Sequence, residues 1–467
     1  KKGSNDLFDF QFMHYHAAQV DFTNPAATAW YKAVLKKAVD LGYDGWMYDF
    51  GEYTPIESIF HDGREGEAVH NVYPLMYQDA CFDFMKGLDP NPNDDYAPDY
   101  AYYVRSGYTG TQARTWAHWT GDPSCDWTYA SGIPAQIPAG LTVGLAGVPF
   151  SGSDIGGFEW YVQPPSSPEL YKRWTLLGCF SGIMRDQTGG FGHGPRTQIF
   201  DDPEAVRVWR KFAKLRTALF PYLYTLAHEH RTTGLPVMRH HLLAFPDDPQ
   251  ALLQNYQYLF GDRFLVAPVV DPGVRSWDVY LPAGETWYDV SSVARYDDAD
   301  GRHRIGWSPA LPGGQEVKVQ APEDVCPLFV RAGTIVATID PSVDTLNPAT
   351  DPRVTTLASR EHLQHLWVWP DAAGKATGSL WDASSFEWAG AALTARGTAK
   401  TVVAQIALGA NGKPTAVVGD ASGTLPEEPS WTALAGVAPG RSAWAWDPGQ
   451  GVLWIRLEPA DRRAEVK

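Results

Sequence analysis

Helix-like and strand-like segments alternate from residue 21 to about residue 190, and this alternation constrains the fold more than any other feature of the sequence. The clearest example begins with Asn24, a residue type that caps helices, and Pro25, which suits the first helical turn. Apolar residues then recur at helical spacing: Trp30, Val34, Ala38 and Leu41. Gly42 can close this helix, and residues 45–48 read as a short buried strand that ends at Asp49.

Similar units follow along the chain. We expect helices at 71–88, 131–147 and 167–182, and strands at 100–104, 114–118, 148–154 and 183–184. Strands that alternate with helices predict a parallel sheet with crossover connections. Polar residues repeatedly follow the strand ends, which is where active sites lie in α/β barrels. The sequence therefore predicts an α/β fold of the TIM-type (β/α)8 barrel class.

The pattern changes in the second half of the chain. A long helix is expected at 203–230, and short β-like runs such as FLVAPVV and TIVATI follow after residue 250. Runs of this kind, separated by Gly and Pro, favour a β-sandwich. We expect a barrel part over 1–235, a proximal β-sandwich domain over 236–340, and a distal, second small β domain over 341–467.

Bulk composition narrows the class of partner. The 467-residue chain has a formal net charge of −16, which argues against nucleic acid or an anionic membrane as its main partner. No stretch approaches the roughly 18 apolar residues of a spanning helix, so no membrane association is expected. The four Cys residues are too scattered for a disulfide framework or a zinc site. The chain begins KKGSND without Met, so we expect its natural start to lie upstream and leave its cellular location open.

Three carboxylates follow strand-like runs: Asp49, Asp122 and Asp154. A single aspartate at a strand end more often caps a helix or a turn, but three at successive strand ends favour a site. Cleavage of an acetal needs one ionised carboxylate that attacks the sugar carbon and one carboxylic acid that protonates the leaving oxygen. Asp49 and Asp122 are the best pair for this chemistry, and Asp154 adds a third polar group at the same rim.

Several stretches resemble glycoside hydrolase family 31, the retaining α-glucosidases and their relatives. They are GYDGWMYDFGEYTP (42–55), WAHWTGD (116–122), SGSDIGG (151–157), VDFTNP (20–25), HNVYP (70–74) and FGDRFLVAPV (260–269). The resemblance covers residues 20 to about 335. It implies the carboxy-terminal part of the family's catalytic chain, with two small β-sandwich domains after the barrel.

The resemblance also implies roles for individual residues. The family's nucleophile falls on Asp49 and its acid/base on Asp122, which would lie roughly 5–5.5 Å apart in a retaining enzyme. Glu52 matches an acid beside the nucleophile. The residues expected to bind or line the sugar site are Arg105, Asp154, Trp119, Phe158, Gln187 and Trp46. No metal and no cofactor is implied.

Two departures from the family pattern bear on specificity. Where the family usually has Arg-x-His after the last barrel strand, this chain has Arg185–Asp186–Gln187, and Gln187 cannot carry charge. The DFGEYTP form resembles the branch with sulfoquinovosidases, α-xylosidases and some glucosyltransferases. A sulfoquinovosidase would be expected to have Tyr where Phe158 stands.

The family places a β-sandwich and three barrel strands before VDFTNP, where this chain has about twenty residues. Five strands cannot close an eight-stranded barrel, and open sheet edges are a liability. We therefore expect that only the later barrel strands are present, and that a companion chain or amino-terminal fragment supplies the rest.

The sequence as a whole predicts a retaining α-glycoside hydrolase that acts on α-glucosides or α-gluco-oligosaccharides, with transglycosylation as a further outcome. The alternatives are a sulfoquinovosidase, α-xylosidase or α-galactosidase of the same family, and a non-catalytic carbohydrate-binding relative. His14 and His16 imitate the HxH pair of metal-dependent barrel hydrolases. No further His follows at later strand ends, so the metal reading is not favoured.

Overall fold

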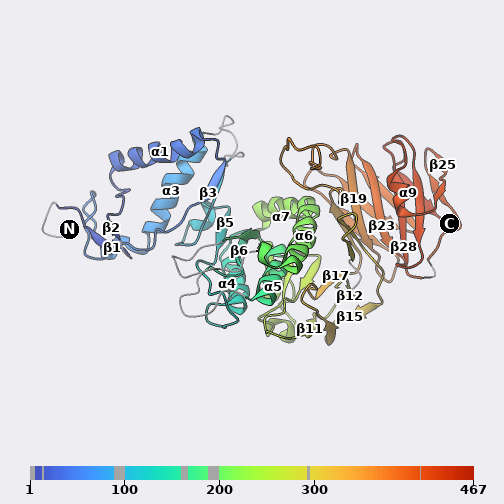
Figure 1. The fold of residues 1–467 in the computed structure, drawn as a ribbon, viewed down its shortest axis with the longest axis horizontal. Coiled ribbons are helices and arrows are strands. Elements are labelled where there is room, and N and C mark those ends of the chain that lie inside the picture. Colours follow the sequence, from blue (N-terminus) through green and yellow to red (C-terminus); the bar gives the residue numbers. More distant parts are fainter. Residues whose placement is uncertain are drawn as a thin grey trace. The chain divides into compact units, whose positions relative to one another are not determined.

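In the computed structural model, helices and strands alternate along the described residues from Pro25 to Asp186, as the sequence pattern predicts (Figure 1). The structure describes residues 6–12, 15–88, 100–158, 167–187, 199–291, 295–410 and 412–467. The chain divides into two compact units. Unit 1 is Lys1–Gly121 with Ala146–Ser151, and unit 2 is Asp122–Leu145 with Gly152–Lys467.

Unit 1 carries the first helix–strand units. Its elements are the hairpin β1 (Phe10–Phe12) and β2 (Tyr15–Ala17), α1 (Pro25–Asp40), β3 (Gly45–Met47), α2 (Gly66–Val69), α3 (Tyr73–Lys86), β4 (Ala101–Val104), η1 (Thr111–Ala113) and β5 (Ala117–Trp119). Strand β4 pairs in parallel with β3 and with β5. The helix start is as predicted, because the Asn24 side chain accepts from the backbone N–H of Ala26 at 3.0 Å. Gly42 adopts a left-handed φ of 91° where α1 ends.

The apolar stripe of α1 is not buried, contrary to what its helical spacing suggests. Trp30 is 61% exposed, Val34 37% and Leu41 79%. The neighbouring face of the same helix does pack, since Tyr31 and Leu35 contact the cluster around the buried Cys81. Hydrophobic spacing predicted the helix but not which of its faces is covered.

Unit 2 continues the barrel part. Its first elements are α4 (Ile133–Leu145), β6 (Phe150–Ile155, which begins in unit 1), α5 (Pro168–Cys179), β7 (Ile183–Asp186), η2 (Ile199–Asp201), α6 (Pro203–Ala218) and α7 (Phe220–Thr233). Strands β6 and β7 pair in parallel, and α5 packs beside α6 (Figure 1). The single helix expected at 203–230 is wrong: the chain forms two helices. Pro221 lacks a backbone N–H and stands in the first turn of α7, which explains the break after Ala218.

The proximal β region follows α7. Its elements are β8 (Met238–Arg239), η3 (His241–Leu243), α8 (Pro249–Leu252), β9 (Tyr258–Phe260), β10 (Phe264–Val266), β11 (Ser276–Leu281), β12 (Thr286–Asp289), β13 (Arg295–Asp297), β14 (Arg302–Arg304), β15 (Ala310–Pro312), β16 (Gln315–Gln320) and β17 (Leu328–Arg331). One sheet has the order β15-β12-β17-β10-β9-β8, and β11 pairs with β16. Trp287 and Phe329 are both fully buried in its core.

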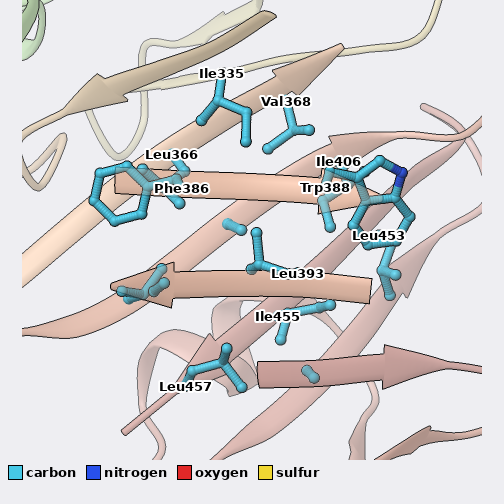
Figure 2. Packing of buried hydrophobic residues seen from close by; sticks show 14 of the residues in the cluster. Ile335, Leu366, Val368, Phe386, Trp388, Leu393, Ile406, Leu453, Ile455 and Leu457 are labelled. Carbon is cyan, nitrogen blue, oxygen red and sulfur yellow. The ribbon is translucent and has the colours of Figure 1, made fainter. Parts of the chain in front are cut away.

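The distal β region is one continuous twelve-stranded sheet. Its elements are β18 (Thr334–Thr338), β19 (Leu363–Trp369), β20 (Ala376–Ser379), β21 (Ser385–Ala389), β22 (Ala392–Arg396), β23 (Thr401–Ala407), β24 (Val417–Gly419), β25 (Gly423–Thr424), β26 (Glu427–Glu428), α9 (Trp431–Ala435), β27 (Ala443–Asp447), β28 (Val452–Leu457) and β29 (Arg463–Val466). Side chains from strands far apart in the sheet order share one core, such as Phe386 of β21 and Ile455 of β28 (Figure 2). The sheet therefore closes over itself as a sandwich.

Strand β18 belongs to the distal sheet and not, as expected, to the proximal sandwich. The run TIVATI was expected to end the proximal sandwich, but β18 pairs with β19 and β20 in the distal sheet. The three expected domain ranges otherwise stay predictions. Among the described residues, no helix is both long enough and apolar enough to cross a membrane. All four cysteines are buried.

Candidate active site

Strand β3 directs Asp49 away from the helices of unit 1. Tyr48, the residue before it, is 2% exposed and stacks on Tyr77 of α3 with ring centroids 3.8 Å apart. Successive residues of a strand face opposite sides, so the Asp49 side chain faces away from this helix layer. Burial raises the pKa of Tyr77, and its protonated hydroxyl donates to the backbone oxygen of Asp49 at 2.9 Å. The helix layer thus holds the backbone of the candidate nucleophile.

The turn after Asp49 is strained. Phe50 adopts a φ of 68°, a left-handed conformation that costs a non-glycine residue about 1–3 kcal/mol. Two hydrogen bonds hold it: Phe50 N–H donates to Asp49 Oδ1 at 2.7 Å, and Ser106 Oγ donates to Phe50 O at 2.6 Å. The strained residue is therefore tied to the carboxylate of the residue before it.

Arg105, just past the end of β4, joins two carboxylates. Its Nε donates to Glu52 Oε1 at 2.8 Å and lies 3.2 Å from Asp49 Oδ1. Its Nη2 donates to Tyr53 Oη at 3.3 Å, and its guanidinium carbon lies 4.7 Å from the centre of the Phe50 ring. The Arg105 side chain is 11% exposed, while those of Asp49 and Glu52 are 31% and 33% exposed. The two carboxylates thus remain reachable from solvent around a mostly buried cation.

In unit 2, the segment after Asp122 contacts the turn after β6. Phe158 N–H donates to the backbone oxygen of Pro123 at 2.7 Å. Gly157 has a φ of 83°, and a side chain there would come within 2.6 Å of the Cα atom of Cys125. Glycine is therefore required for this close approach, which brings Phe158 next to the segment that carries the exposed Asp122.

Asp154 meets Arg185 through the register of two strands. These residues are Cα partners in the parallel pair β6–β7. Asp154 is 1% exposed, and Arg185 forms an ion pair with its Oδ1. Arg185 also donates to the side-chain oxygen of Gln187. Ser153, one residue earlier, faces the helices and accepts from Trp174 Nε1 at 2.8 Å, so alternation turns Asp154 to the other face.

The predicted aromatic lining is only partly supported. Trp46 packs with Tyr48 against the helix-side cluster of unit 1, so its expected role as a sugar contact is not supported. It is three residues before Asp49, an odd spacing that places the two on opposite faces of β3. Trp119 is 1% exposed and packs edge-to-face on Tyr103 at 5.4 Å, which leaves almost no surface for a ligand. Phe158 is half-buried beside Pro123.

The structure thus brings together Asp49, Glu52 and Arg105 in unit 1, and Asp154 with Gln187 in unit 2. Sequence reasoning missed the contacts made by Phe50, Tyr53, Ser106 and Arg185. The segment DFGEY carried one signal, because a Gly directly after a strand marks a turn or a close approach of the backbone. Among the described residues, no group of three or more His, Cys, Asp or Glu side chains could hold a metal ion, and His14 lies outside these residues.

Two protein-family models match this chain. The model of the glycosyl hydrolases family 31 TIM-barrel domain matches residues 2–226, and that of the family 31 C-terminal domain matches residues 234–336. Together they cover well over half of the chain.

Two curated relatives illustrate the range of named activities. The sulfoquinovosidase of Escherichia coli (strain K12) is 32% identical over 71% of this chain and 46% of its own length. The α-xylosidase of Emericella nidulans is 34% identical over 72% of this chain and 40% of its own length. The chain therefore spans about half the length of the curated relatives it matches.

Solved structures share the fold. A GH31 dextranase of Flavobacterium johnsoniae, complexed with glucose, superposes with a TM-score of 0.79 at 24% identity, over 99% of this chain and 57% of that one. A GH31 sulfoquinovosidase from E. rectale, bound to an aza-sugar inhibitor, gives a TM-score of 0.61 at 30% identity, over 70% of this chain and 45% of that one.

Proposed function

The chain belongs to glycoside hydrolase family 31, and from this premise we propose that it forms the catalytic part of a retaining α-glycoside hydrolase that acts on α-glucosides or α-gluco-oligosaccharides. The observation that carries the proposal is the contact of Asp49 with Arg105 just past the ends of β3 and β4. A guanidinium 3.2 Å from a carboxylate oxygen favours the ionised form that a nucleophile needs.

The reaction has two displacements. A carboxylate oxygen of Asp49 attacks the anomeric carbon, the bond from that carbon to the leaving oxygen breaks, and Asp122 gives its proton to the leaving oxygen. A water molecule or an acceptor hydroxyl then gives a proton to Asp122 and attacks the same carbon, which releases Asp49. Two inversions produce net retention, and a sugar hydroxyl in place of water produces transglycosylation.

Arg185 and Gln187 are the proposed sugar-binding pair, and the buried carboxylate of Asp154 holds the Arg185 guanidinium in place. The guanidinium can donate to sugar hydroxyls, and the Gln187 amide can both donate and accept. A charge-balanced guanidinium beside a neutral amide suits the hydroxyls of a neutral pyranose.

A sulfoquinovoside is the second candidate substrate, because the E. coli and E. rectale relatives are sulfoquinovosidases. A sulfonate needs uncompensated donors or cations, whereas Arg185 is paired with Asp154 and the Phe158 ring has no hydroxyl to donate. We therefore rank α-glucosides first. Hydrolysis rates on 4-nitrophenyl α-glucoside, α-xyloside, α-galactoside and α-sulfoquinovoside test this order, with the β-glucoside as control. A faster rate on the sulfoquinovoside than on the glucoside would reverse it.

We propose further that additional barrel strands, linked to this chain or carried by a companion chain, cover one side of unit 1. Two observations support this: the exposed stripe of Trp30, Val34 and Leu41, and the edge of β3, which no described strand pairs. Exposed apolar stripes and open sheet edges are both surfaces that proteins normally cover. Full activity of the isolated 467-residue chain would refute this part of the proposal.

A further inference from the structure

A second polar cavity, of about 230 Å³, lies in unit 2 where the hairpin β13–β14 meets the distal sheet. Two hydrogen bonds attach the chain after the hairpin to that sheet. Ile305 N–H donates to the Gln405 side chain at 2.9 Å, and Trp307 N–H donates to Gln450 O at 2.9 Å. None of the predicted active-site residues lines this cavity.

The lining of the cavity carries an excess of cations. It contains Arg302, Arg304, Arg360 and Arg456 but only one carboxylate, that of Asp340. Carboxylates outside the lining balance two of these: Arg304 pairs with Asp297 and Asp300, and Arg456 pairs with Glu458. Asp340 itself lies 3.2 Å from Nε2 of His365.

Arg302 and Arg360 are the cations left over. Within the described parts of the chain, no carboxylate lies in ion-pair range of either side chain. Arg302 stacks over Trp431, with its guanidinium carbon 5.4 Å from the ring centre, and its Nε is buried without an acceptor. Arg360 is exposed and makes one long hydrogen bond of 3.4 Å, to Ser342. A buried donor on an unbalanced cation is costly unless an anion completes it.

The same cavity presents buried acceptors. Nε2 of His303 lies 2.7 Å from the backbone oxygen of Lys211, which can only accept, so this nitrogen carries the proton. Burial lowers the pKa of His303 to about 4, so the ring is neutral and its Nδ1 is an acceptor, buried and without a donor. Nδ1 of His365 is also buried and without a hydrogen-bond partner. A ligand hydroxyl is a suitable donor for Nδ1 of His303.

We propose that this cavity is an accessory binding site for a monosaccharide that carries an anionic group, either a carboxylate or a phosphate. The anionic group pairs with Arg302 and Arg360, and a ring hydroxyl donates to Nδ1 of His303. A cavity of about 150 Å³ holds a benzene molecule, so 230 Å³ suits one substituted sugar ring and not an oligosaccharide. The packed pair Trp431 and Trp454, with ring centroids 5.6 Å apart, contributes to the apolar part of the wall.

Titration calorimetry on the full chain tests the proposal with glucuronate, glucose 6-phosphate and neutral glucose as probes, and with inorganic phosphate as competitor. We expect one of the two anionic sugars to bind at least about tenfold more tightly than glucose, because the charge-assisted contacts are lost with the neutral sugar. If glucose 6-phosphate binds more tightly and inorganic phosphate competes with it, the anionic group of the ligand is a phosphate. If glucuronate binds more tightly than glucose 6-phosphate, the anionic group is a carboxylate.

Two substitutions and one matched control locate the site. Arg302→Met and Arg360→Met each remove one cation from the cavity and should weaken binding of the anionic sugar at least about tenfold. Arg360 is exposed, so its substitution does not endanger folding. Arg353→Met, at an exposed arginine that pairs with Asp351 outside the cavity, should leave binding unchanged.

Three outcomes would overturn the proposal: no saturable binding at millimolar concentrations, equal affinity for glucose, or undiminished binding in both Arg302→Met and Arg360→Met. Binding at the proposed catalytic site would survive both substitutions and is thereby distinguished. The assay measures binding and not turnover, so its result does not depend on the proposed hydrolase activity.

Discussion

Arg105 holds its Nε atom 3.2 Å from Oδ1 of Asp49, so the candidate nucleophile is in contact with a mostly buried cation. Glu52 shares the same guanidinium, which leaves two carboxylates around one positive charge. The excess negative charge is suited to the positive charge that develops at the anomeric carbon in the transition state. The cation keeps the carboxylates together, and in the proposed reaction the surplus negative charge faces the anomeric carbon.

Asp49→Asn removes the proposed nucleophile with almost no change in shape. We expect kcat to fall at least about 1000-fold, because an amide oxygen does not form the glycosyl ester. The measurement is the hydrolysis of 4-nitrophenyl α-glucoside by the complete barrel assembly. Asp44→Asn, an exposed residue five positions earlier, is the matched control and should keep wild-type turnover. Wild-type turnover by Asp49→Asn would refute the assignment.

Glu52→Gln tests the shared guanidinium. Loss of one charge-assisted hydrogen bond, worth about 1.5–3 kcal/mol, should lower kcat roughly 10–100-fold by loosening Arg105 and reducing the negative charge near the sugar. Comparing kcat with the unfolding temperature separates this effect from general destabilisation. Glu57→Gln, in the same loop but exposed, serves as control. If Glu52→Gln changes only the unfolding temperature, Glu52 has a structural role alone.

Asp122→Ala should affect substrates according to their leaving groups. A poor leaving group such as an alkoxide needs a proton from the acid, so its kcat/KM should fall about 10²–10⁴-fold. A dinitrophenolate needs little protonation, so its cleavage should fall much less. Steady-state kinetics on both α-glucosides measure the contrast. Equal losses for the two leaving groups would argue against Asp122 as the general acid.

Arg185→Met should destabilise unit 2, because it removes the guanidinium paired with the 1% exposed carboxylate of Asp154. Breaking a buried ion pair from one side typically costs about 3–5 kcal/mol of unfolding free energy. Urea unfolding measures the loss. The double variant Asp154→Asn/Arg185→Met should recover part of it, since no unbalanced charge then remains. A double variant no more stable than the single one would contradict this account.

His303 should make the protein acid-sensitive. Burial lowers its folded-state pKa from 6.5 to about 4, so the unfolded chain binds a proton more readily than the folded one. Stability is therefore full above pH 6.5 and is lost as the pH falls from 6.5 towards 4, by roughly 3 kcal/mol at most. His303→Gln keeps a donor for Lys211 O but does not titrate, so its unfolding free energy should fall less over this range. If the unfolding free energies of the wild-type protein and of His303→Gln fall equally between pH 6.5 and pH 4, the prediction is wrong.

The sequence predicted where local elements begin and end. The start of α1 at Asn24–Pro25, its end near Gly42, and the position of Asp49 just after β3 all depend on residues close together in the sequence. Capping, glycine conformation and strand alternation act over a few residues, so a pattern predicts them. The same alternation places Trp46 on the face opposite to Asp49.

The tertiary structure decided which distant residues meet. Strand register pairs Asp154 with Arg185, the end of β4 brings Arg105 to Asp49, and docking of a hairpin on the distal sheet creates the second cavity. Helical spacing made Trp30 and Leu41 look buried, yet their exposure depends on what packs against α1. The sequence by itself determined the order of elements and the chemistry at their ends, because both follow from short-range interactions. Only strand register and packing between segments far apart in the chain decided which of those groups form ion pairs, line one cavity or pack in one core.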